Sequence, residues 1–168
     1  MNEAKSSELF PKPVVKAGFV FGAASAVINL LAVIPILGIF FSLINWVIGL
    51  LAGYSVISTV GGSKEKLPEV LKHTVVTGAI AGLVSGFGGG VASVLNGLLF
   101  ARVSFFGVYY TPGLADYISW FIGAFVWGVV GMVIWNTLGG IIQVYYTPDK
   151  LPASVRVQLD KIVAFLKK

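Results

Sequence analysis

The chain alternates between long apolar stretches and short polar segments. The apolar stretches run roughly over Val14–Ile34, Ile36–Val60, Thr74–Ala101 and Leu114–Val144. Each is long enough for a helix to cross the hydrocarbon layer of a bilayer, which is about 30 Å thick and needs about 20 apolar residues. The pattern therefore predicts an all-α, polytopic membrane protein with four transmembrane helices.

The connections predict how these spans are paired. Pro35 and Gly38 mark a tight turn between the first two spans, which places a first hairpin within residues 14–62. The last two spans form a second hairpin within residues 74–146, with an external loop at about 102–113. Both of these spans are longer than a bilayer requires. We expect a bend at Gly88–Gly90, because glycine weakens a helix.

Small residues gather on one face of each predicted helix. In the third span, Gly78, Gly82, Gly86 and Gly90 repeat every four residues, and such a repeat forms a continuous stripe on a helix. In lipid, a stripe of this kind lets two helix backbones approach closely. The predicted helix-packing glycines are Gly18, Gly22, Gly49, Gly53, Gly78, Gly82, Gly86, Gly90, Gly128 and Gly131.

The two hairpins also resemble each other in sequence. The matched segments are Val14–Lys16 with Val70–Lys72, Gly22 with Gly78, Gly53 with Gly131, Ser58–Gly62 with Asn136–Gly140, and Lys66–Pro68 with Lys150–Pro152. Two spans per copy give both copies the same orientation, so the matches predict a parallel repeat about the membrane normal. Apolar sequence of low complexity can produce similar matches by chance, and both explanations stay open here.

Positive charge predicts the orientation of the bundle. The cations on one side are Lys5, Lys12, Lys16, Lys64, Lys66, Lys72, Lys150, Arg156, Lys161, Lys167 and Lys168, and the opposite connections hold only Arg102. Cytoplasmic segments of membrane proteins carry the excess of Lys and Arg. We therefore expect both termini and segments 1–13, 63–73 and 147–168 to be cytoplasmic, in a multi-pass protein of the cell membrane.

The segments outside the spans have patterns of their own. In the tail 147–168, Val155, Leu159, Ile162 and Leu166 share one helical face, which predicts a short amphipathic helix. It would lie on the cytoplasmic leaflet with its cations toward anionic lipid headgroups, or pack on the soluble domain of a partner. The aromatic residues between 105 and 110 suit either an anchor at the membrane surface or a loop that binds a partner or ligand.

Composition supports the membrane interpretation. Of the 168 residues, 57% are hydrophobic and 11% are charged, and the mean hydropathy is +0.90. The net charge of +5 would suggest nucleic-acid binding in a soluble protein, but these cations follow the predicted topology, so we expect no nucleic-acid partner. The chain has no cysteine, which excludes disulfides and thiolate metal sites.

Polar residues inside the spans are the best indicators of function, because they are costly in lipid. Asn29, Asn45 and Asn96 each lie on a small-residue face of their helix. They could line a polar path for a solute. Alternatively, they form hydrogen bonds between helices that fix the packing, at about 0.6 kcal/mol each.

We find no pattern of residues that predicts catalysis. His73 is the only histidine, and no acidic residue follows it at metal-binding spacing. The carboxylates lie outside the hydrocarbon layer or at its edge, so the sequence predicts no catalytic residue, no metal site and no cofactor. Trp120, Trp127 and Trp135 lie near small residues of the fourth span, which favours packing against a neighbour over an aromatic cage for a cation.

The runs Ile34-Pro35-x-x-Gly38, Gly49–Tyr54 and Gly78–Gly82 resemble small glycine-rich four-span membrane proteins of prokaryotes, many of them archaeal. The resemblance covers the first three spans. The function of those proteins is not established, so the resemblance implies a topology and no activity.

The first three spans each carry a small-residue face, and an odd number of faces leaves one without a partner inside the chain. The sequence therefore favours a non-enzymatic packing or assembly subunit of the lipid bilayer, which forms a homo-oligomer or docks onto other membrane subunits. The alternative is a small passive channel or carrier, with a polar path lined by Asn29, Asn45 and Asn96. An enzyme acting on lipids would need a catalytic cluster, which the sequence does not contain.

Overall fold

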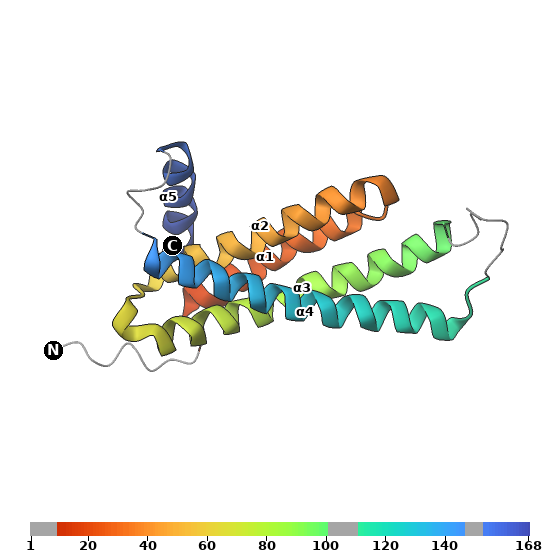
Figure 1. Cartoon of the computed structure of the whole chain (residues 1–168), viewed down its shortest axis with the longest axis horizontal. Coiled ribbons are helices and arrows are strands. Elements are labelled where there is room, and N and C mark those ends of the chain that lie inside the picture. The colour runs from red at the N-terminus through yellow and green to blue at the C-terminus, as the bar shows by residue number, and fades with distance from the viewer. Residues whose placement is uncertain (1–9, 101–110, 147–152) are drawn as a thin grey trace.

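The computed structural model describes residues 10–100, 111–146 and 153–168, and every regular element within them is helical (Figure 1). The elements are α1 (Lys12–Leu31), α2 (Pro35–Val60), the 3₁₀ turn η1 (Lys64–Lys66), α3 (Leu67–Phe100), α4 (Leu114–Tyr145) and α5 (Ala153–Lys167). The four helices α1 to α4 are long and apolar enough to cross a membrane. The four predicted spans are thus confirmed as helices.

Local sequence explains where these helices begin and end. Pro35 opens α2, where its missing N–H is not needed. Gly61 ends α2 with a positive φ of 81°, a conformation that glycine adopts without strain. At the start of α4, the backbone N–H of Gly113 donates to Oδ2 of Asp116 at 2.7 Å. The negative charge of this carboxylate also stabilises the N-terminus of the helix, which is the positive end of its dipole.

Helix α3 differs from the sequence prediction. It begins at Leu67 instead of near Thr74, because Pro68 is well suited to a first helical turn. The polar segment 63–73 therefore consists of η1 and the first turns of α3. The helix assignment runs unbroken through Gly88–Gly90, and the bend expected there stays a prediction. Gly88 allows a close approach, since a Cβ there would lie 2.7 Å from Cβ of Ala26 on α1.

The bundle of four long helices has two ends that differ in structure. At the α5 end, named for the helix that lies across it, α1 and α3 begin and α2 and α4 finish. At the turn end lie the α1–α2 turn, the last residues of α3 and the first residues of α4. Figure 1 shows the α1–α2 pair and the α3–α4 pair close together at the α5 end and apart at the turn end.

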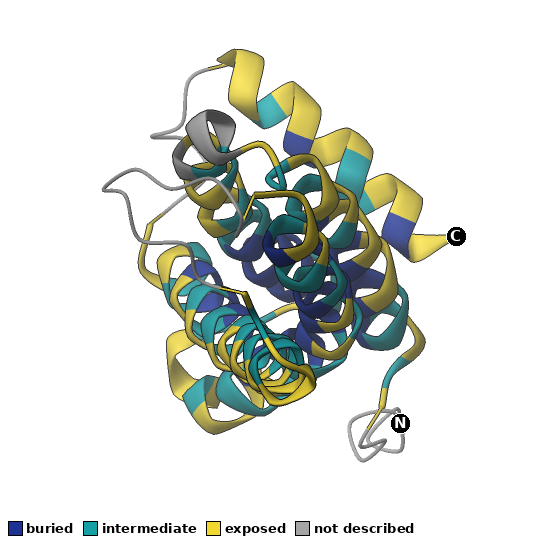
Figure 2. Cartoon of the chain, turned by 90° about the vertical axis from the view of Figure 1, so that its right-hand side faces the viewer, coloured by how far each residue is buried: buried dark blue, intermediate teal, exposed yellow. Residues whose placement is uncertain are grey.

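The hydrophobic core lies at the α5 end. It contains Val14, Ala17, Phe21, Ala52, Val56, Ile57, Val70 and Leu166. Figure 2, viewed from the turn end, shows the buried residues in the interior and exposed ones around the outside. Exposed apolar residues such as Phe40, Leu83 and Ile122 are suited to acyl chains, as expected for spanning helices.

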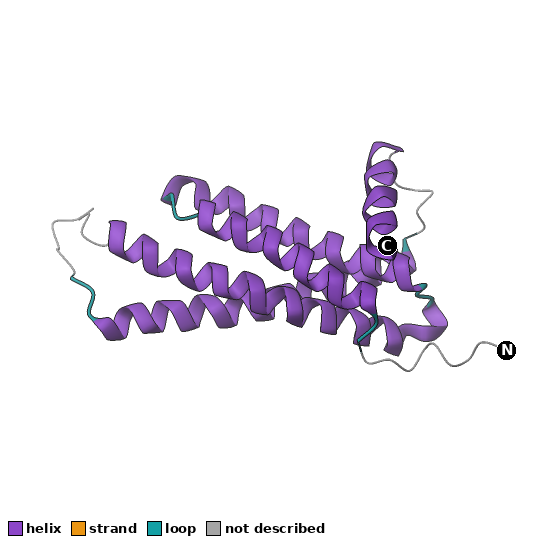
Figure 3. Cartoon of the chain, turned by 180° about the vertical axis from the view of Figure 1, so that it is seen from behind, coloured by secondary structure: helices purple, strands orange, loops and turns teal. Residues whose placement is uncertain are grey.

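Helix α5 runs across the direction of the long helices (Figure 3). Leu166 on its inner face is 3% exposed and belongs to the core. Lys16 on α1 donates from Nζ to the carbonyl oxygen of Phe165 at 2.8 Å and lies 4.0 Å from the centre of the Phe165 ring. The predicted C-terminal helix is therefore present, and its apolar face packs against the bundle.

The matched glycines of the proposed repeat have different surroundings. A Cβ on Gly22 would meet Ala81 of α3, whereas one on Gly78 would meet Val133 of α4. Gly53 abuts the backbone of Asn136, but Gly131 has no atom within 4 Å of its Cβ position. The sequence repeat stays a prediction, and the two halves of the chain pack differently.

Candidate functional site

Two cavities lie between the helix pairs, and both are lined by Asn29. The end cavity has a volume of about 590 Å³ and is lined by residues of α1, α3 and α4 near the turn end. The side cavity has a volume of about 410 Å³ and lies between α2 and α4, reaching in to α1 and α3.

A chain of hydrogen bonds joins three helices around Asn29, the residue that lines both cavities. Ser25 Oγ donates to Oδ1 of Asn45 at 2.8 Å, and Asn45 Nδ2 donates to Oδ1 of Asn29 at 2.6 Å. Asn29 Nδ2 then donates to the backbone carbonyl of Ser85 at 2.9 Å. The amides of α1 and α2 are thus held in fixed positions against α3, and their polar atoms remain beside the cavities.

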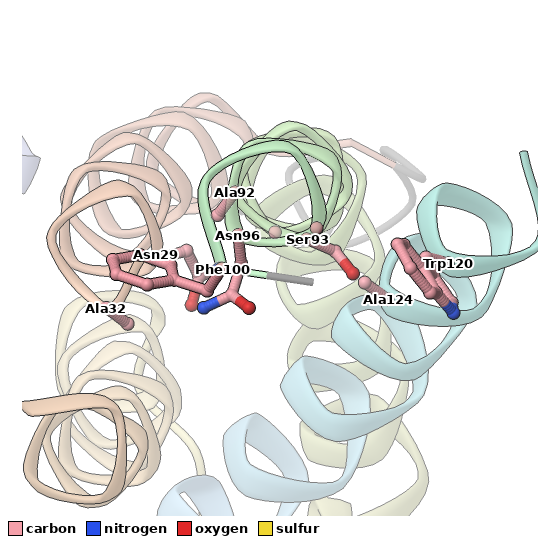
Figure 4. Close-up of a pocket in the computed structure, with 10 residues that line it drawn as sticks. Asn29, Ala32, Ala92, Ser93, Asn96, Phe100, Trp120 and Ala124 are labelled. Atoms are coloured by element: carbon pink, nitrogen blue, oxygen red, sulfur yellow. The ribbon is translucent and has the colours of Figure 1, made fainter. Parts of the chain in front are cut away.

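The end cavity carries a third amide. Figure 4 shows Asn29 and Asn96 on neighbouring helices, with Trp120 and Ala124 of α4 across from them. Asn96 Nδ2 donates to the carbonyl oxygen of Val33 at 2.9 Å, which ties α3 to the α1–α2 turn. Ser93 lies on the same lining, so the polar side chains Asn29, Ser93 and Asn96 lie on the α1 and α3 side, among alanine, glycine and Phe100. The α4 side consists of Trp120 and Ala124.

The side cavity has a polar interior and an aromatic rim. Ser25, Asn29 and Asn45 line its inner part. Its outer residues include Trp46 and Trp127, which are 46% and 76% exposed on the flank of the bundle. The rings of Trp46 and Trp135 stack with their centres 5.2 Å apart, and this pair forms the corner where α2 and α4 come together.

Toward the α5 end the space between α2 and α4 is closed by backbone contact. Gly53 abuts the backbone of Asn136, and Gly139 abuts the backbone of Leu50. A Cβ on Gly49 would lie 2.6 Å from Cβ of Trp135. These contacts close the side cavity toward α5, and its exposed lining residues lie on the flank.

The seal contains a buried polar group. Asn136 is fully buried, and its Nδ2 donates to the carbonyl oxygen of Met132 at 2.8 Å. Its Oδ1 has no hydrogen-bond partner among the described residues. A buried acceptor without a partner costs about 1–3 kcal/mol, so the sealed arrangement carries a local energetic cost.

The described residues that line both cavities are uncharged. They offer amides, hydroxyls, backbone carbonyls and aromatic rings, which bind uncharged hydrogen-bonding groups. In the part of the chain that the structure describes, no group of three His, Asp or Glu side chains is arranged to hold a metal ion. The described lining therefore offers hydrogen-bonding and aromatic groups without a charged side chain.

The structure brings the three predicted amides to one region and distributes the predicted glycines over the helix contacts. On α3, Gly78, Gly82 and Gly86 face the backbone of α4, and Gly90 faces the Phe121 ring. The remaining contacts are Gly18 with Ile80, Gly22 with Ala81, Gly49 with Trp135, Gly53 with Asn136, and Gly128 with Gly86. Gly131 differs, because it lines the side cavity and no atom lies within 4 Å of its Cβ position.

Several site residues were not singled out from the sequence. Trp46 and the carbonyl of Ser85 complete the side cavity. The i, i+4 spacing of Ser25 with Asn29 places their side chains on one face, and this is the signal that could have marked Ser25 as a site residue. The aromatic loop at 105–110 lies outside the described residues.

Comparison of the chain with protein-family models, curated proteins and solved structures found no match.

Proposed function

We propose that this protein is a small membrane carrier for uncharged polar solutes. The observation that supports this best is the polar region around Asn29, which lines two cavities between four helices long enough to span a membrane. The solute enters the end cavity from the turn end. Asn29 and Asn96, which line this cavity, then replace part of its hydration by hydrogen bonds.

The orientation of the bundle follows from its charges. Among the described residues, the cations lie at or near the α5 end, on the first turns of α1 and α3, on η1 and on α5. The positive-inside rule then places the α5 end in the cytoplasm, with the basic residues of α5 beside anionic headgroups of the cell membrane. The end cavity opens to the outside in this orientation.

The uncharged lining supports selectivity for uncharged solutes. Moving an ion into this region would require a compensating charge, and the described lining residues supply none. Small polyols and amides need only hydrogen-bonding partners, which the asparagine and serine side chains provide. Glycerol and urea are therefore the simplest test solutes.

The sealed α5 end favours a carrier over a permanently open pore. A carrier opens its binding site to one side of the membrane at a time. The contacts of Gly53 with Asn136 and of Gly139 with Leu50 close the path toward the cytoplasm in this conformation. When α2 and α4 separate there, water reaches Oδ1 of Asn136, which lowers the free-energy cost of opening.

Solute flux into proteoliposomes tests the proposal. Light scattering after a glycerol or urea gradient should show faster and saturable equilibration than in protein-free liposomes. Asn29→Leu should abolish the increase by removing the shared amide. Ser93→Leu, which narrows the end cavity without breaking any of the hydrogen bonds described above, should slow it.

Ser119→Ala is the matched control, because Ser119 is exposed and bonds only within its own helix, to the carbonyl of Ala115. Its flux should equal that of the wild type. Equal rates in liposomes with and without the folded wild-type protein would contradict the proposal, as would unchanged flux in both Asn29→Leu and Ser93→Leu.

A role as an assembly subunit is the second candidate. The glycine faces of α1, α2 and α3 pack within the chain, so the odd number of faces no longer supports docking of a further subunit. Helix α4 nevertheless has the smallest buried share of the four spans, and its outer surface near Gly123 suits another membrane helix or a second copy. A particle of one chain in native lipid would contradict this candidate.

A further inference from the structure

The side cavity has an opening on the flank of the bundle, between α2 and α4. Trp46, Trp127 and Ile134 line this cavity and are also exposed on the outer surface. Both helices are long and apolar enough to span a membrane, so their flank faces acyl chains. A molecule entering by this opening comes from the bilayer and not from water.

The side cavity has both apolar and polar lining residues. Its exposed lining residues are Trp46, Trp127, Val130, Ile134 and Ser42, and the more buried ones include Ser25, Asn29, Asn45 and Met132. Each asparagine amide has two N–H groups, and one of them makes the hydrogen bond given above. The second N–H of each amide is left for a ligand that reaches the interior.

Gly131 provides room for an extended chain beside this polar interior. It lines the side cavity, and no atom lies within 4 Å of its Cβ position. Gly128, one turn away, also lines the cavity. An acyl chain can therefore lie along α4 between the Trp127 and Trp135 rings, with its polar head toward Asn29 and Asn45.

We propose that the side cavity binds an uncharged lipid with a hydroxyl-bearing head group, of the monoacylglycerol type. Hydroxyls both donate to and accept from amides, which matches the interior. A phosphate head would find no cation among the described lining residues. This inference goes beyond solute transport, because it assigns a lipid ligand to the second cavity.

Photolabelling of the purified full chain in detergent tests this site. The probe is a monoacylglycerol with a diazirine in its acyl chain, and labelled peptides are mapped by mass spectrometry. Labelling should concentrate on α2 and α4 around Trp46 and residues 127–135. Monoolein should compete at least about tenfold better than methyl oleate, which lacks the hydroxyls, or an oleoyl lysophosphatidylglycerol, which carries a phosphate.

Two glycines of α4 give a matched pair of variants. Gly131 and Gly123 both have open Cβ positions, but only Gly131 lines the side cavity. Gly131→Leu should lower site labelling at least about tenfold, and Gly123→Leu should leave it unchanged. Because both positions are open, both variants should fold.

Labelling spread evenly over the exposed faces of all four spans would overturn the proposal. Equal competition by monoolein and methyl oleate would overturn it as well, and this comparison needs no variant. The assay measures binding without flux, so its failure leaves the solute-carrier proposal standing, and failure of the flux assay leaves the lipid site standing.

Discussion

Asn29 connects packing with the binding site. Its amide nitrogen bonds to the backbone of α3 and its oxygen accepts from Asn45 of α2, so one side chain holds three helices together. Each such bond contributes only about 0.6 kcal/mol in a membrane protein. The same side chain lines both cavities. A role of Asn29 in helix packing and a role in solute binding are therefore compatible.

Asn136 provides a prediction that separates stability from transport. Asn136→Leu replaces the buried amide, whose Oδ1 has no partner among the described residues, by an apolar group of similar size. We expect the free energy of unfolding of the sealed conformation to rise by about 1 kcal/mol or more, because the cost of burying the unpaired Oδ1 is removed. Thermal unfolding in detergent should show a higher Tm, and glycerol flux should fall because opening no longer hydrates this position.

The matched control is Thr59→Val, which removes a hydroxyl that bonds within its own helix, to the carbonyl of Ser55. It should leave the flux unchanged. A lower Tm together with unchanged flux in Asn136→Leu would contradict the role given to this buried oxygen.

At single positions, the sequence predicted which residues are polar or small, but not which contacts they make. Asn29 and Asn45 could be placed near each other because both lie on small-residue faces. The bond from Asn29 to the Ser85 carbonyl depends on how far α1 is shifted along α3. Helical periodicity carries no information about that shift. The open position of Gly131 likewise depends on how the neighbouring helices are shifted relative to α4.

Helix α5 is held against the bundle by few contacts. Leu166 is nearly fully buried, and Lys16 contacts the carbonyl and the ring of Phe165. The amphipathic pattern predicted this helix, because apolar residues repeat on one face. The pattern did not tell whether that face would meet lipid or protein, since both are apolar. In the structure it meets α1 and α2.

Truncating this contact should release α5 without unfolding the spans. Leu166→Ala removes a buried side chain and costs about 2–5 kcal/mol, which weakens the packing of α5 on the core. Hydrogen exchange should become faster in α5 and remain slow in α1 and α2. Val157→Ala is the control, because Val157 is 51% exposed on the same helix. Equal exchange in both variants would show that α5 does not depend on Leu166.

The whole molecule combines a closed half and an open half. The packed core and the glycine contacts of α2 with α4 lie toward α5, and the cavities lie toward the turn end. The sequence predicted the four spans because their length and hydropathy are local properties. The separation of the helix pairs at one end is a property of the assembled bundle, so no single segment encodes it.

The absence of native cysteine allows this asymmetry to be measured directly in membranes. Ser93→Cys, in the end cavity, should react with a membrane-impermeant maleimide added outside sealed cells. Ser55→Cys lies among fully buried residues near the α5 end and should react from neither side. Glu65→Cys, on the exposed turn η1, should react only after permeabilisation, because the cations predict that this turn is cytoplasmic. Modification of Glu65→Cys in intact cells would contradict the predicted orientation. Fast modification of Ser55→Cys would contradict a sealed carrier and indicate an open pore.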